Sequence, residues 1–253
     1  MQGYGSAFAR VYNVRWVLFA RQKAEIILPF ITPIIENRSL PKTLLDVCCG
    51  TGRFDSLFLE HDWHVTGIDL SPDMINFAKE NNELFVNSGS ADYIVADASC
   101  MRLEKSYSLA VSLYDALNHL PNAEALVSCF ESVYNALHVG GHFVFDLNTR
   151  KGLLRWNGIS VTEDDDMTII SRGVFDASMD KAYTTISGFV KNPNHSYERF
   201  SETVYNVVYN MNDVQSMLYD VGFSAIRMTD GIHLNESLDQ PEDVGRVFFI
   251  AEK

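Results

Sequence analysis

One stretch decides the fold that this chain of 253 residues predicts: Leu44-Leu45-Asp46-Val47-Cys48-Cys49-Gly50-Thr51-Gly52. Its first five residues belong to a short apolar run, Thr43–Cys48, which has the length expected for a buried strand. Two glycines follow, and residues Phe54–Glu60 then show helical spacing. Glycine permits positive φ and lets a ligand approach the backbone, and a helix start offers free N–H groups. The pattern therefore predicts a strand, a tight turn and a helix, with a ligand site at the turn.

The same alternation continues along the chain on both sides of this turn. Residues Ser6–Ile35 have helical spacing, and we expect Pro29 and Pro33 to kink or end a second helix there. Ser71-Pro72 predicts a helix start, and a later helix from Pro121-Asn122 is expected to stop at Gly140-Gly141. Further strands are predicted at His64–Asp69, Tyr93–Ala96, Leu109–Leu113 and His142–Asp146. Strands that alternate with helices at this spacing indicate a parallel sheet.

The alternation breaks after Asn148. Residues 150–205 contain three β-rich pieces separated by turn formers, at Thr168–Phe175, Tyr183–Val190 and Phe200–Val208. A helix is expected at Val214–Asp220 and ends at Gly222, and Phe223–Met228 and Arg246–Glu252 predict a closing pair of strands. We interpret residues 150–205 as an antiparallel insertion in one α/β domain formed by residues 1–149 and 206–253. The acidic run Glu163–Asp166 is expected to be a solvated loop.

Composition argues against several classes of partner. The chain has 33 acidic and 20 basic side chains, a net charge of −13, and no cluster of Lys and Arg. A nucleic-acid binder needs such a cluster to displace counterions, and an acidic surface also disfavours anionic membranes. The longest apolar run, Ile26–Ile35, is far shorter than the ~20 residues that span a bilayer. We therefore expect neither a nucleic-acid partner nor a membrane partner.

Four cysteines are present and show no spacing typical of a disulfide framework: Cys48, Cys49, Cys100 and Cys129. Met1–Arg10 lacks the apolar core of a signal peptide. These features favour a cytoplasmic protein with reduced thiols. The histidines show no ligand spacing, so no metal site is predicted.

Three acids follow three predicted strands: Asp46, Asp69 and Asp97. Ligands of such sheets bind at the carboxyl ends of the strands. Asp69 suits the two hydroxyls of a ribose, although it could instead cap the next helix. Asp97 suits an exocyclic adenine amine, although it could be an ordinary loop residue. Asp46 suits a ligand that carries an ammonium group.

A nicotinamide-dependent oxidoreductase shares much of this pattern. Its turn, however, carries a third glycine three residues after the second. Here that place is Asp55, and we expect its carboxylate to repel a pyrophosphate. The sequence therefore favours a ligand without phosphates, and the oxidoreductase stays open as an alternative.

The order of these motifs resembles class I S-adenosylmethionine-dependent methyltransferases. The resemblance lies in the glycine-rich segment Leu45–Gly52, the ribose segment Ile68–Met74, the adenine segment Ala96–Ala98, the segment Leu137–Asp146 and the closing strands. Tyr114–His119 and Phe145–Thr149, followed by a β-rich insert, are similar to a subgroup with a small antiparallel lid that acts on small molecules. The resemblance implies a Rossmann-like sheet, mostly parallel with an antiparallel last strand, and a lid at residues 150–205. It also implies S-adenosylmethionine as cofactor and S-adenosylhomocysteine as product.

The resemblance further implies residue roles. Gly50 and Gly52 would lie against the methionine part of the cofactor, and Asp46 would help to hold its ammonium. Leu113 and Tyr114 would flank the sulfonium, and the N-terminal helix would close over the cofactor. The full predicted cofactor set is Tyr12, Trp16, Asp46, Cys48, Gly50, Thr51, Gly52, Asp69, Leu70, Met74, Asp97, Ala98 and Leu113. Tyr12 and Trp16 could equally be a stripe of core residues.

The chemistry that follows is methyl transfer to an N or O atom of a small molecule. The enzyme mainly aligns donor and acceptor, and a hydroxyl acceptor usually needs a base as well. Candidate bases are His119, Asp115 and Tyr114. A non-catalytic protein that binds S-adenosylmethionine is a second alternative. We expect a monomer or a homodimer.

Overall fold

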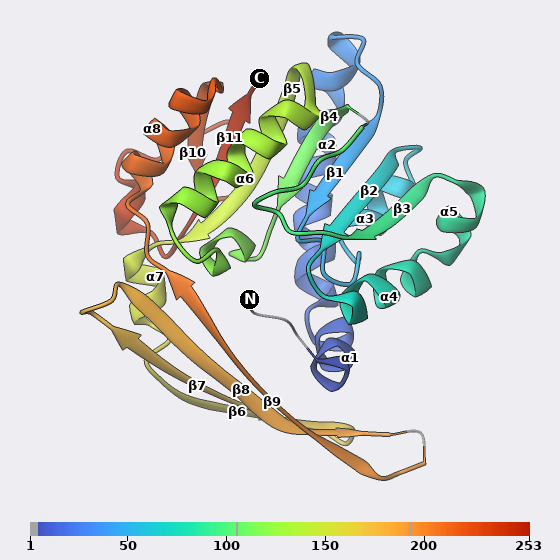
Figure 1. Ribbon diagram of the computed structural model, residues 1–253, viewed down its shortest axis with the longest axis vertical. Coiled ribbons are helices and arrows are strands. Elements are labelled where there is room, and N and C mark those ends of the chain that lie inside the picture. The colour runs from blue at the N-terminus through green and yellow to red at the C-terminus, as the bar shows by residue number, and fades with distance from the viewer. Residues whose placement is uncertain (1–4, 105, 193) are drawn as a thin grey trace.

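Two sheets organise the computed structural model, which describes residues 5–104, 106–192 and 194–253. The larger sheet has seven strands in the order β10-β11-β5-β4-β1-β2-β3, and the smaller has four in the order β6-β7-β8-β9 (Figure 1). Met1–Tyr4, part of the segment considered for a signal peptide, lie outside the described residues. The predicted α/β fold with an antiparallel β insertion is confirmed.

The seven-stranded sheet is parallel through its first five strands. These are β1 (Thr43–Val47), β2 (His64–Asp69), β3 (Ala91–Val95), β4 (Tyr107–Ser112) and β5 (Leu137–Asn148). The closing strands are β10 (Ser224–Thr229) and β11 (Arg246–Glu252), and β11 runs antiparallel to both β5 and β10. All five carboxyl ends of the parallel strands therefore meet at one edge of the sheet.

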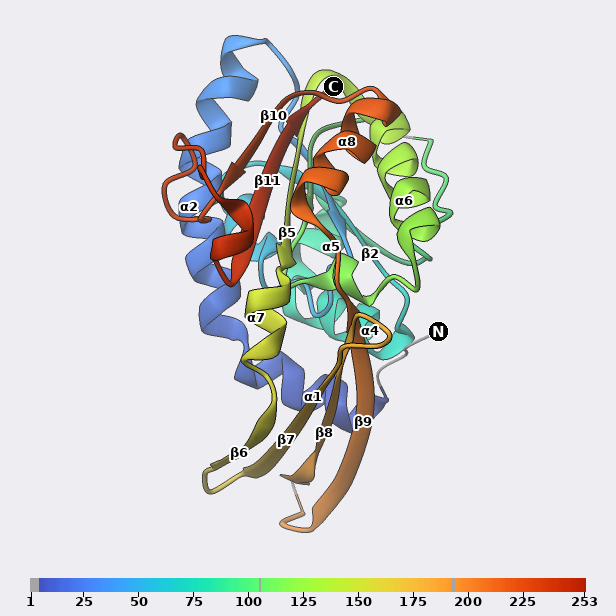
Figure 2. The ribbon, with the colours of Figure 1, turned by 90° about the vertical axis from the view of Figure 1, so that its left-hand side faces the viewer.

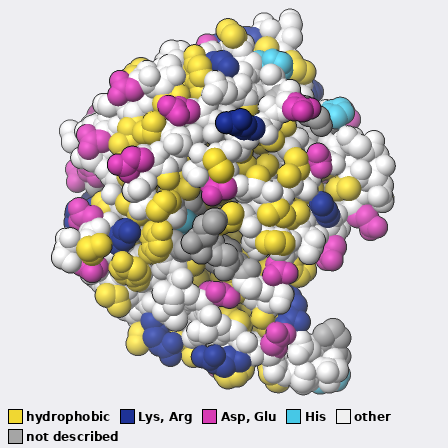
Figure 3. Space-filling view, in the orientation of Figure 1, with side chains coloured by type: hydrophobic (Ala, Val, Ile, Leu, Met, Phe, Trp, Pro, Cys, Tyr) yellow, Lys and Arg dark blue, Asp and Glu magenta, His cyan; other side chains and the backbone are white. Residues whose placement is uncertain are grey.

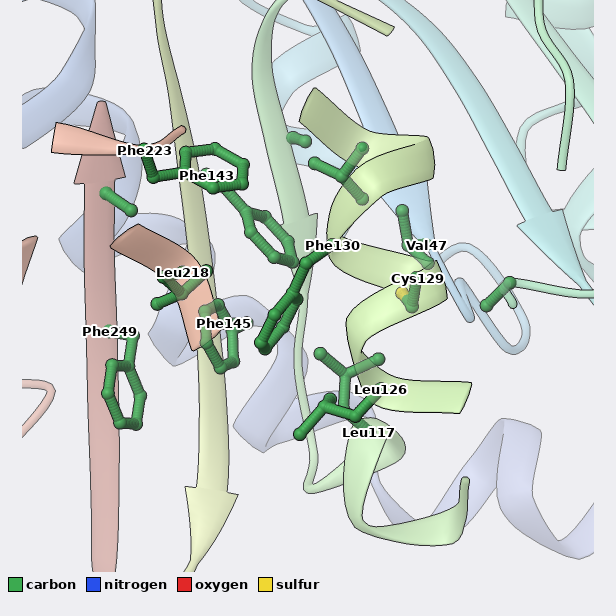
Figure 4. Packing of buried hydrophobic residues seen from close by; sticks show 14 of the residues in the cluster. Val47, Leu117, Leu126, Cys129, Phe130, Phe143, Phe145, Leu218, Phe223 and Phe249 are labelled. Atoms are coloured by element: carbon green, nitrogen blue, oxygen red, sulfur yellow. The ribbon is translucent and has the colours of Figure 1, made fainter. Parts of the chain in front are cut away.

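Helices cover both faces of this sheet (Figure 1). On one face lie α6 (Ala123–Ala136) and α8 (Met211–Val221), and on the other lie α2 (Val17–Asn37) and α3 (Asp55–Leu59). Next to β3 lie α4 (Pro72–Asn81) and α5 (Glu83–Ser88). The core under α6 and α8 is aromatic: Phe145 stacks on Phe143 at 4.6 Å and on Phe249 at 4.8 Å between ring centroids (Figure 4). Offset stacking of this kind adds about 0.5–1.5 kcal/mol per pair beyond burial.

Helix ends follow the predicted chemistry at two places. Ser71 caps α4, because its hydroxyl accepts a hydrogen bond from the Met74 N–H at 3.3 Å and Pro72 occupies the first turn. Gly222 ends α8 with φ at 119°.

Two helix ends differ from the prediction. α2 does not end at Pro29 or Pro33 but continues to Asn37, and both prolines lie on its exposed face. α6 ends at Ala136 and not at Gly140, because Leu137 already has extended backbone and begins β5. Within the described residues, no helix is both long and apolar enough to cross a membrane.

The smaller sheet follows the short helix α7 (Arg150–Leu154) in the chain and lies below the strand ends of the larger sheet in Figures 1 and 2. Its strands are β6 (Gly158–Glu163), β7 (Met167–Asp176), β8 (Lys181–Lys191) and β9 (Tyr197–Val207). The sequence prediction did not include β6, although Ile159 and Val161 alternate with Ser160 and Thr162; in the structure every residue of this strand is exposed. Glu163 ends β6, and Asp164 builds the following turn by accepting from the N–H groups of Asp166 and Met167.

Helix α1 (Ser6–Arg15) packs between α4 and the small sheet. Phe8 is buried and its ring lies 6.1 Å from that of Phe200 on β9. The same cluster includes Met74 of α4 and Ile169 of β7. A chamber is thus enclosed by the strand ends, α1 and the small sheet.

Candidate active site

A cavity of about 810 Å³ lies at the carboxyl ends of the parallel strands. Its wall on the sheet side includes Cys48, Gly50, Asp69, Leu70, Met74, Asp97, Leu113, Tyr114, Asp115 and His119. Tyr12 of α1 and Trp16, which follows this helix, also line it, and residues 155–160 with β7, β8 and β9 line it from the small sheet. The structure therefore brings twelve of the sequence-predicted site residues to one chamber.

The glycine-rich turn is fixed by Asp69. One carboxylate oxygen accepts from the Gly50 N–H at 2.9 Å and the other from the Ser71 N–H at 2.8 Å. Burial raises the pKa of Asp69, and these backbone N–H groups oppose that shift. Asp69 therefore fixes the turn and the residue that caps α4, in addition to lining the cavity, and its contact with a ribose stays a prediction.

Gly50 has φ at 55° and faces the cavity. A Cβ atom at this position would lie 3.3 Å from the ring of Tyr12, so the space between the turn and α1 depends on glycine. This cradle, open backbone beside two acids, suits a ligand that approaches the main chain.

Gly52 and Ala98 do not line the cavity. A Cβ at Gly52 would lie 2.9 Å from the Asn82 side chain and 3.1 Å from Ala78, so this glycine permits close packing of α4. Ala98 is buried in the core beneath α6. The geometry gives the predicted cofactor contacts of these two residues no support.

Asp46 and Thr51 line a smaller cavity of about 30 Å³. This small cavity and the large one share five wall residues, so they adjoin: Tyr12, Trp16, Cys48, Leu113 and Tyr114. Asp46 therefore lies at the inner end of the same site.

Asp55 begins α3 as expected, but its carboxyl does not face a ligand. The side chain is fully buried and accepts from the Tyr93 hydroxyl at 3.0 Å. The expected repulsion of a pyrophosphate by Asp55 is thus wrong, because packing of α3 turns this carboxyl inward.

Asp97 presents one carboxylate oxygen to its own turn. That oxygen accepts from the N–H of Ser99 at 2.9 Å and from its hydroxyl at 2.7 Å. Asp97 and Ser99 both line the cavity. The second carboxylate oxygen has lone pairs for a ligand donor.

Tyr12 and Trp16 are neither only core residues nor freely exposed. Their rings stack at 5.0 Å between centroids, and both line the cavity. The Trp16 carbonyl accepts from the Tyr114 hydroxyl at 3.0 Å, which ties the end of α1 to the loop after β4.

Of the three candidate bases, Tyr114 and Asp115 are committed to structural contacts. Burial raises the pKa of Tyr114, and its proton is already donated to Trp16. Asp115 is paired with Arg246 at 2.6 Å and accepts from the Asn206 amide at 2.7 Å. Both residues also have positive φ, at 68° and 50°, a backbone strain that these contacts hold in place.

His119 differs from the other two. Its Nδ1 lies 2.7 Å from the carbonyl oxygen of Tyr205, which can only accept, so Nδ1 carries the proton. The neutral ring then has its lone pair on Nε2, which lies 3.9 Å from Asp115. A cavity-lining imidazole in this tautomer is able to accept a proton.

The sequence missed a charged cluster in the same wall. Arg246 of β11 pairs with Asp115 and with Asp146 of β5, and Asn206 of the small sheet joins the group through Asp115. Burial raises the pKa of Asp146, and Arg246 opposes that shift. Asp146 could have been noticed as one more acid near a strand end, but its arginine lies 100 residues further along the chain.

The surface agrees with the acidic composition. Asp and Glu side chains are spread over the face in Figure 3, and Lys and Arg form no continuous band across it. Within the described residues, no group of three or more His, Cys, Asp or Glu side chains is arranged to hold a metal ion.

Comparison with known proteins bears on this site. Residues 44–141 match the model of a family described as "Methyltransferase domain". The chain is 28% identical over 223 residues to a Bacillus subtilis protein named as a methyltransferase, YqeM. The alignment covers 85% of this chain and 86% of that protein. The fold is similar to a solved S-adenosylmethionine-dependent methyltransferase from Clostridium acetobutylicum, with a TM-score of 0.81 and 22% identity over 97% of each chain.

Residues 44–141 thus match a methyltransferase domain, and the whole chain is similar to S-adenosylmethionine-dependent methyltransferases in fold. Streptomyces venezuelae DesVI is also similar in fold, with a TM-score of 0.76 and 20% identity over 98% of this chain and 99% of that one.

Two further solved neighbours are described as bound to S-adenosylmethionine and to S-adenosylhomocysteine, and the geometry of this site fits such a ligand. The cavity adjoins the buried acid Asp46, contains the cradle at Gly50 and presents Asp69 and Asp97 at successive strand ends. The donors and acceptors thus match a ligand with an amino group, a ribose and an adenine.

Proposed function

We propose that the protein transfers a methyl group from S-adenosylmethionine to an N or O atom of a small molecule held between the two sheets. The observation that carries this proposal is the single cavity of about 810 Å³, which has cofactor motifs in one wall and the small sheet in the other. Bound S-adenosylmethionine would supply a methyl group that its sulfonium already activates. The chain then contributes mainly alignment, which can lower a barrier by about 7–11 kcal/mol.

On the sheet side, we assign cofactor binding to residues that the cavity brings together. Asp69 would accept from ribose hydroxyls and Asp97 from the adenine amine, while Asp46 would face the ammonium. Tyr12 and Trp16 would cover the cofactor from α1 and exclude water. Cys48, Gly50, Thr51, Leu70, Met74 and Leu113 would supply the remaining contacts.

On the other side, the acceptor would lie against the lid, which we place at residues 150–205, with residues 1–149 and 206–253 as the cofactor-binding domain. The lid wall is rich in hydroxyl and amide groups, from Asn157, Ser160, Ser171 and Thr184. Such groups suit a polyhydroxylated acceptor. This chain is 29% identical over 104 residues, 41% of each chain, to a Streptomyces venezuelae enzyme named as a dTDP-amino-sugar N,N-dimethyltransferase, and a sugar N-methyltransferase shares the fold. An amino sugar is therefore our first choice of acceptor.

His119 is the residue we assign to proton removal. Its Nε2 is the acceptor atom of the neutral ring, while the Tyr205 carbonyl fixes the ring through Nδ1. Asp115 and Tyr114 would position this wall and not exchange protons. An acceptor amine would lose its proton to His119 or to water, and an acceptor hydroxyl would depend on His119.

The test is methyl transfer by the purified protein from methyl-labelled S-adenosylmethionine to a panel of amino sugars and hydroxylated metabolites. We expect label in at least one acceptor and an equal amount of S-adenosylhomocysteine. Thermal stabilisation by S-adenosylhomocysteine and not by NADH would reject the oxidoreductase. Cofactor binding without transfer to any acceptor would favour a non-catalytic protein.

We also propose that nucleic acids are not acceptors, which the net charge of −13 supports. A monomer or homodimer and a cytoplasmic location are predictions from the sequence alone.

A further inference from the structure

Helix α1 and the glycine-rich turn face each other at the inner end of the site. The ring of Tyr12 lies so close to the turn that a Cβ atom at Gly50 would be 3.3 Å from it. The next residue on α1, Asn13, is 9% exposed and contacts the end of α4 instead. Asn13 lines neither of the two cavities described above. Its buried amide therefore serves a contact within the protein.

Asn81, the last residue of α4, uses its amide hydrogens to join α1 to the turn. Its Nδ2 donates to the Asn13 Oδ1 at 2.7 Å and to the Thr51 carbonyl at 2.8 Å. A primary amide carries two N–H hydrogens, so both contacts are made at once. Thr51 is 2% exposed and lines the small cavity together with Asp46. One side chain that lines neither cavity thus bridges α1 and the glycine-rich turn.

Arg53, just after the turn, reinforces this bridge from the other side. It donates from Nε to the Asn13 Oδ1 at 3.0 Å. Together with Asn81, it fills both acceptor positions of that oxygen. A charged donor makes the stronger kind of hydrogen bond. Asn13 is therefore anchored to the turn segment directly through Arg53 and indirectly through Asn81.

The neighbouring amide, Asn82, supports the turn without reaching α1. It donates to the Gly52 carbonyl at 3.0 Å and to the Tyr93 oxygen at 2.9 Å. Among the hydrogen bonds of the described residues, those of the Asn82 side chain stay on the large-sheet side of the site. Of these two adjacent amides, Asn81 is therefore the one that connects the turn to the helix above it.

We propose that Asn81 and Asn13 are positioning residues that hold α1 and the glycine-rich turn together when the cofactor binds. The inference rests on the proposed function, which assigns the turn and the ring of Tyr12 to S-adenosylmethionine. A cofactor that contacts both needs them at a fixed separation, and the amide bridge sets that separation. Without the bridge, α1 moves away from the turn more readily, so the bound cofactor should be released faster.

The first experiment measures binding of S-adenosylhomocysteine to the full chain by calorimetry and its dissociation rate by stopped-flow displacement. Asn81→Asp keeps the size of the side chain but removes both donors, and its carboxylate then faces two oxygens. We expect roughly 10-fold weaker binding of S-adenosylhomocysteine, mainly as faster dissociation. Asn87→Asp, on the exposed surface of α5, is the matched control and should bind like the unmutated protein.

A double-mutant cycle separates positioning from a general loss of stability. Asn13→Ala and Asn81→Ala remove opposite ends of one contact, so their effects on affinity should not add. We expect each to weaken binding of S-adenosylhomocysteine by roughly 10-fold, and the double variant to bind little more weakly than Asn81→Ala alone. A merely structural contact would lower the free energy of unfolding and leave the dissociation rate unchanged.

Hydrogen exchange adds a measurement that needs only the unmutated protein. Saturating S-adenosylhomocysteine should slow the exchange of backbone amides in α1 and in residues 50–53 together, because the bridge makes the two segments respond as one.

Each outcome supports or overturns the proposal. Slower exchange in both segments, faster release from Asn81→Asp and a non-additive cycle support it. Exchange in α1 that is the same with and without S-adenosylhomocysteine overturns it, even if the variants do not fold. Additive effects in folded variants, or an unchanged dissociation rate in Asn81→Asp, also overturn it. If S-adenosylhomocysteine does not bind the unmutated protein, the proposed function fails and this inference fails with it. That result is distinct, because every other outcome starts from a bound complex.

Discussion

Two strands of equal length show how differently the two walls of the site are built. All six residues of β4 are buried, and all six residues of β6 are exposed. β4 lies between β1 and β5 with helices on both faces of its sheet, whereas β6 is the edge strand of a sheet whose buried cluster with α1 includes residues of β7, β8 and β9 and none of β6. We call the cavity wall at the strand ends of the large sheet the cofactor wall, and the wall formed by residues 155–160 and the small sheet the acceptor wall. The cofactor wall is thus fixed by a packed core, and the acceptor wall is held mainly by strand pairing. This division suits an enzyme that binds one constant cofactor and an acceptor that differs among relatives.

Where the two walls meet, His119 is expected to have the largest effect on activity. His119→Ala should lower turnover by about 10²–10⁴-fold for a hydroxyl acceptor, because general-base catalysis contributes about that much. Binding of S-adenosylhomocysteine should not change, since the ring is fixed by Tyr205 of the lid and not by the cofactor turn. Turnover and calorimetric affinity measure the two effects.

His61→Ala is the control. The Nδ1 atom of His61 also lies near a carbonyl oxygen, at 2.8 Å from that of Leu57. His61 is exposed, however, and lines neither cavity. Unchanged turnover in His119→Ala with the true acceptor would remove His119 from the mechanism.

The second prediction concerns the cluster that joins the walls. Arg246→Leu leaves Asp146, which is 0% exposed, without its counter-charge. Breaking a buried pair in this way costs about 3–5 kcal/mol, and we expect that loss in the free energy of unfolding measured with denaturant.

Arg38→Leu breaks a comparable pair, with Glu252 at 2.7 Å, on the surface. It should cost about 1 kcal/mol or less. Equal losses for Arg246→Leu and Arg38→Leu would show that the Arg246 cluster does not join the walls.

The third prediction tests the cofactor wall by itself. Asp69→Asn exchanges an acceptor for an amide, so one of the N–H groups of Gly50 and Ser71 loses its partner. The hydrogen bond that we propose from a ribose hydroxyl to this carboxylate is worth about 1.5–3 kcal/mol, so its loss corresponds to roughly 10–150-fold weaker binding of S-adenosylhomocysteine. Asp92→Asn, an exposed change on β3, should leave this affinity unchanged. Equal affinities in the two variants would contradict the role of Asp69.

The contrast between the walls also explains what could be predicted from sequence. β2 has the predicted bounds, and the turn at Gly50 was located, because a buried strand, glycines and a capped helix are local signals. The strand β6 has only a short local signal, in which Ile159 and Val161 alternate with Ser160 and Thr162, and neither of its faces is buried. The direction of Asp55 and the pairing of Arg246 with Asp146 depend on packing between distant segments. A sequence therefore places acids at strand ends more readily than it shows which way they point.

The smallest effects test the comparison most directly, because the same substitution can be made in both walls. Val111 on β4 is 0% exposed and Val161 on β6 is 60% exposed. Val111→Thr buries a hydroxyl without a ready partner and should lower the free energy of unfolding by about 1–3 kcal/mol. Val161→Thr should change it by about 0.5 kcal/mol or less, since threonine suits an exposed strand as well as valine does. Denaturant unfolding of the two variants gives both numbers. A cost at Val161 as large as that at Val111 would mean that the outer face of the small sheet is covered in solution, and the acceptor wall would then be as firmly packed as the cofactor wall.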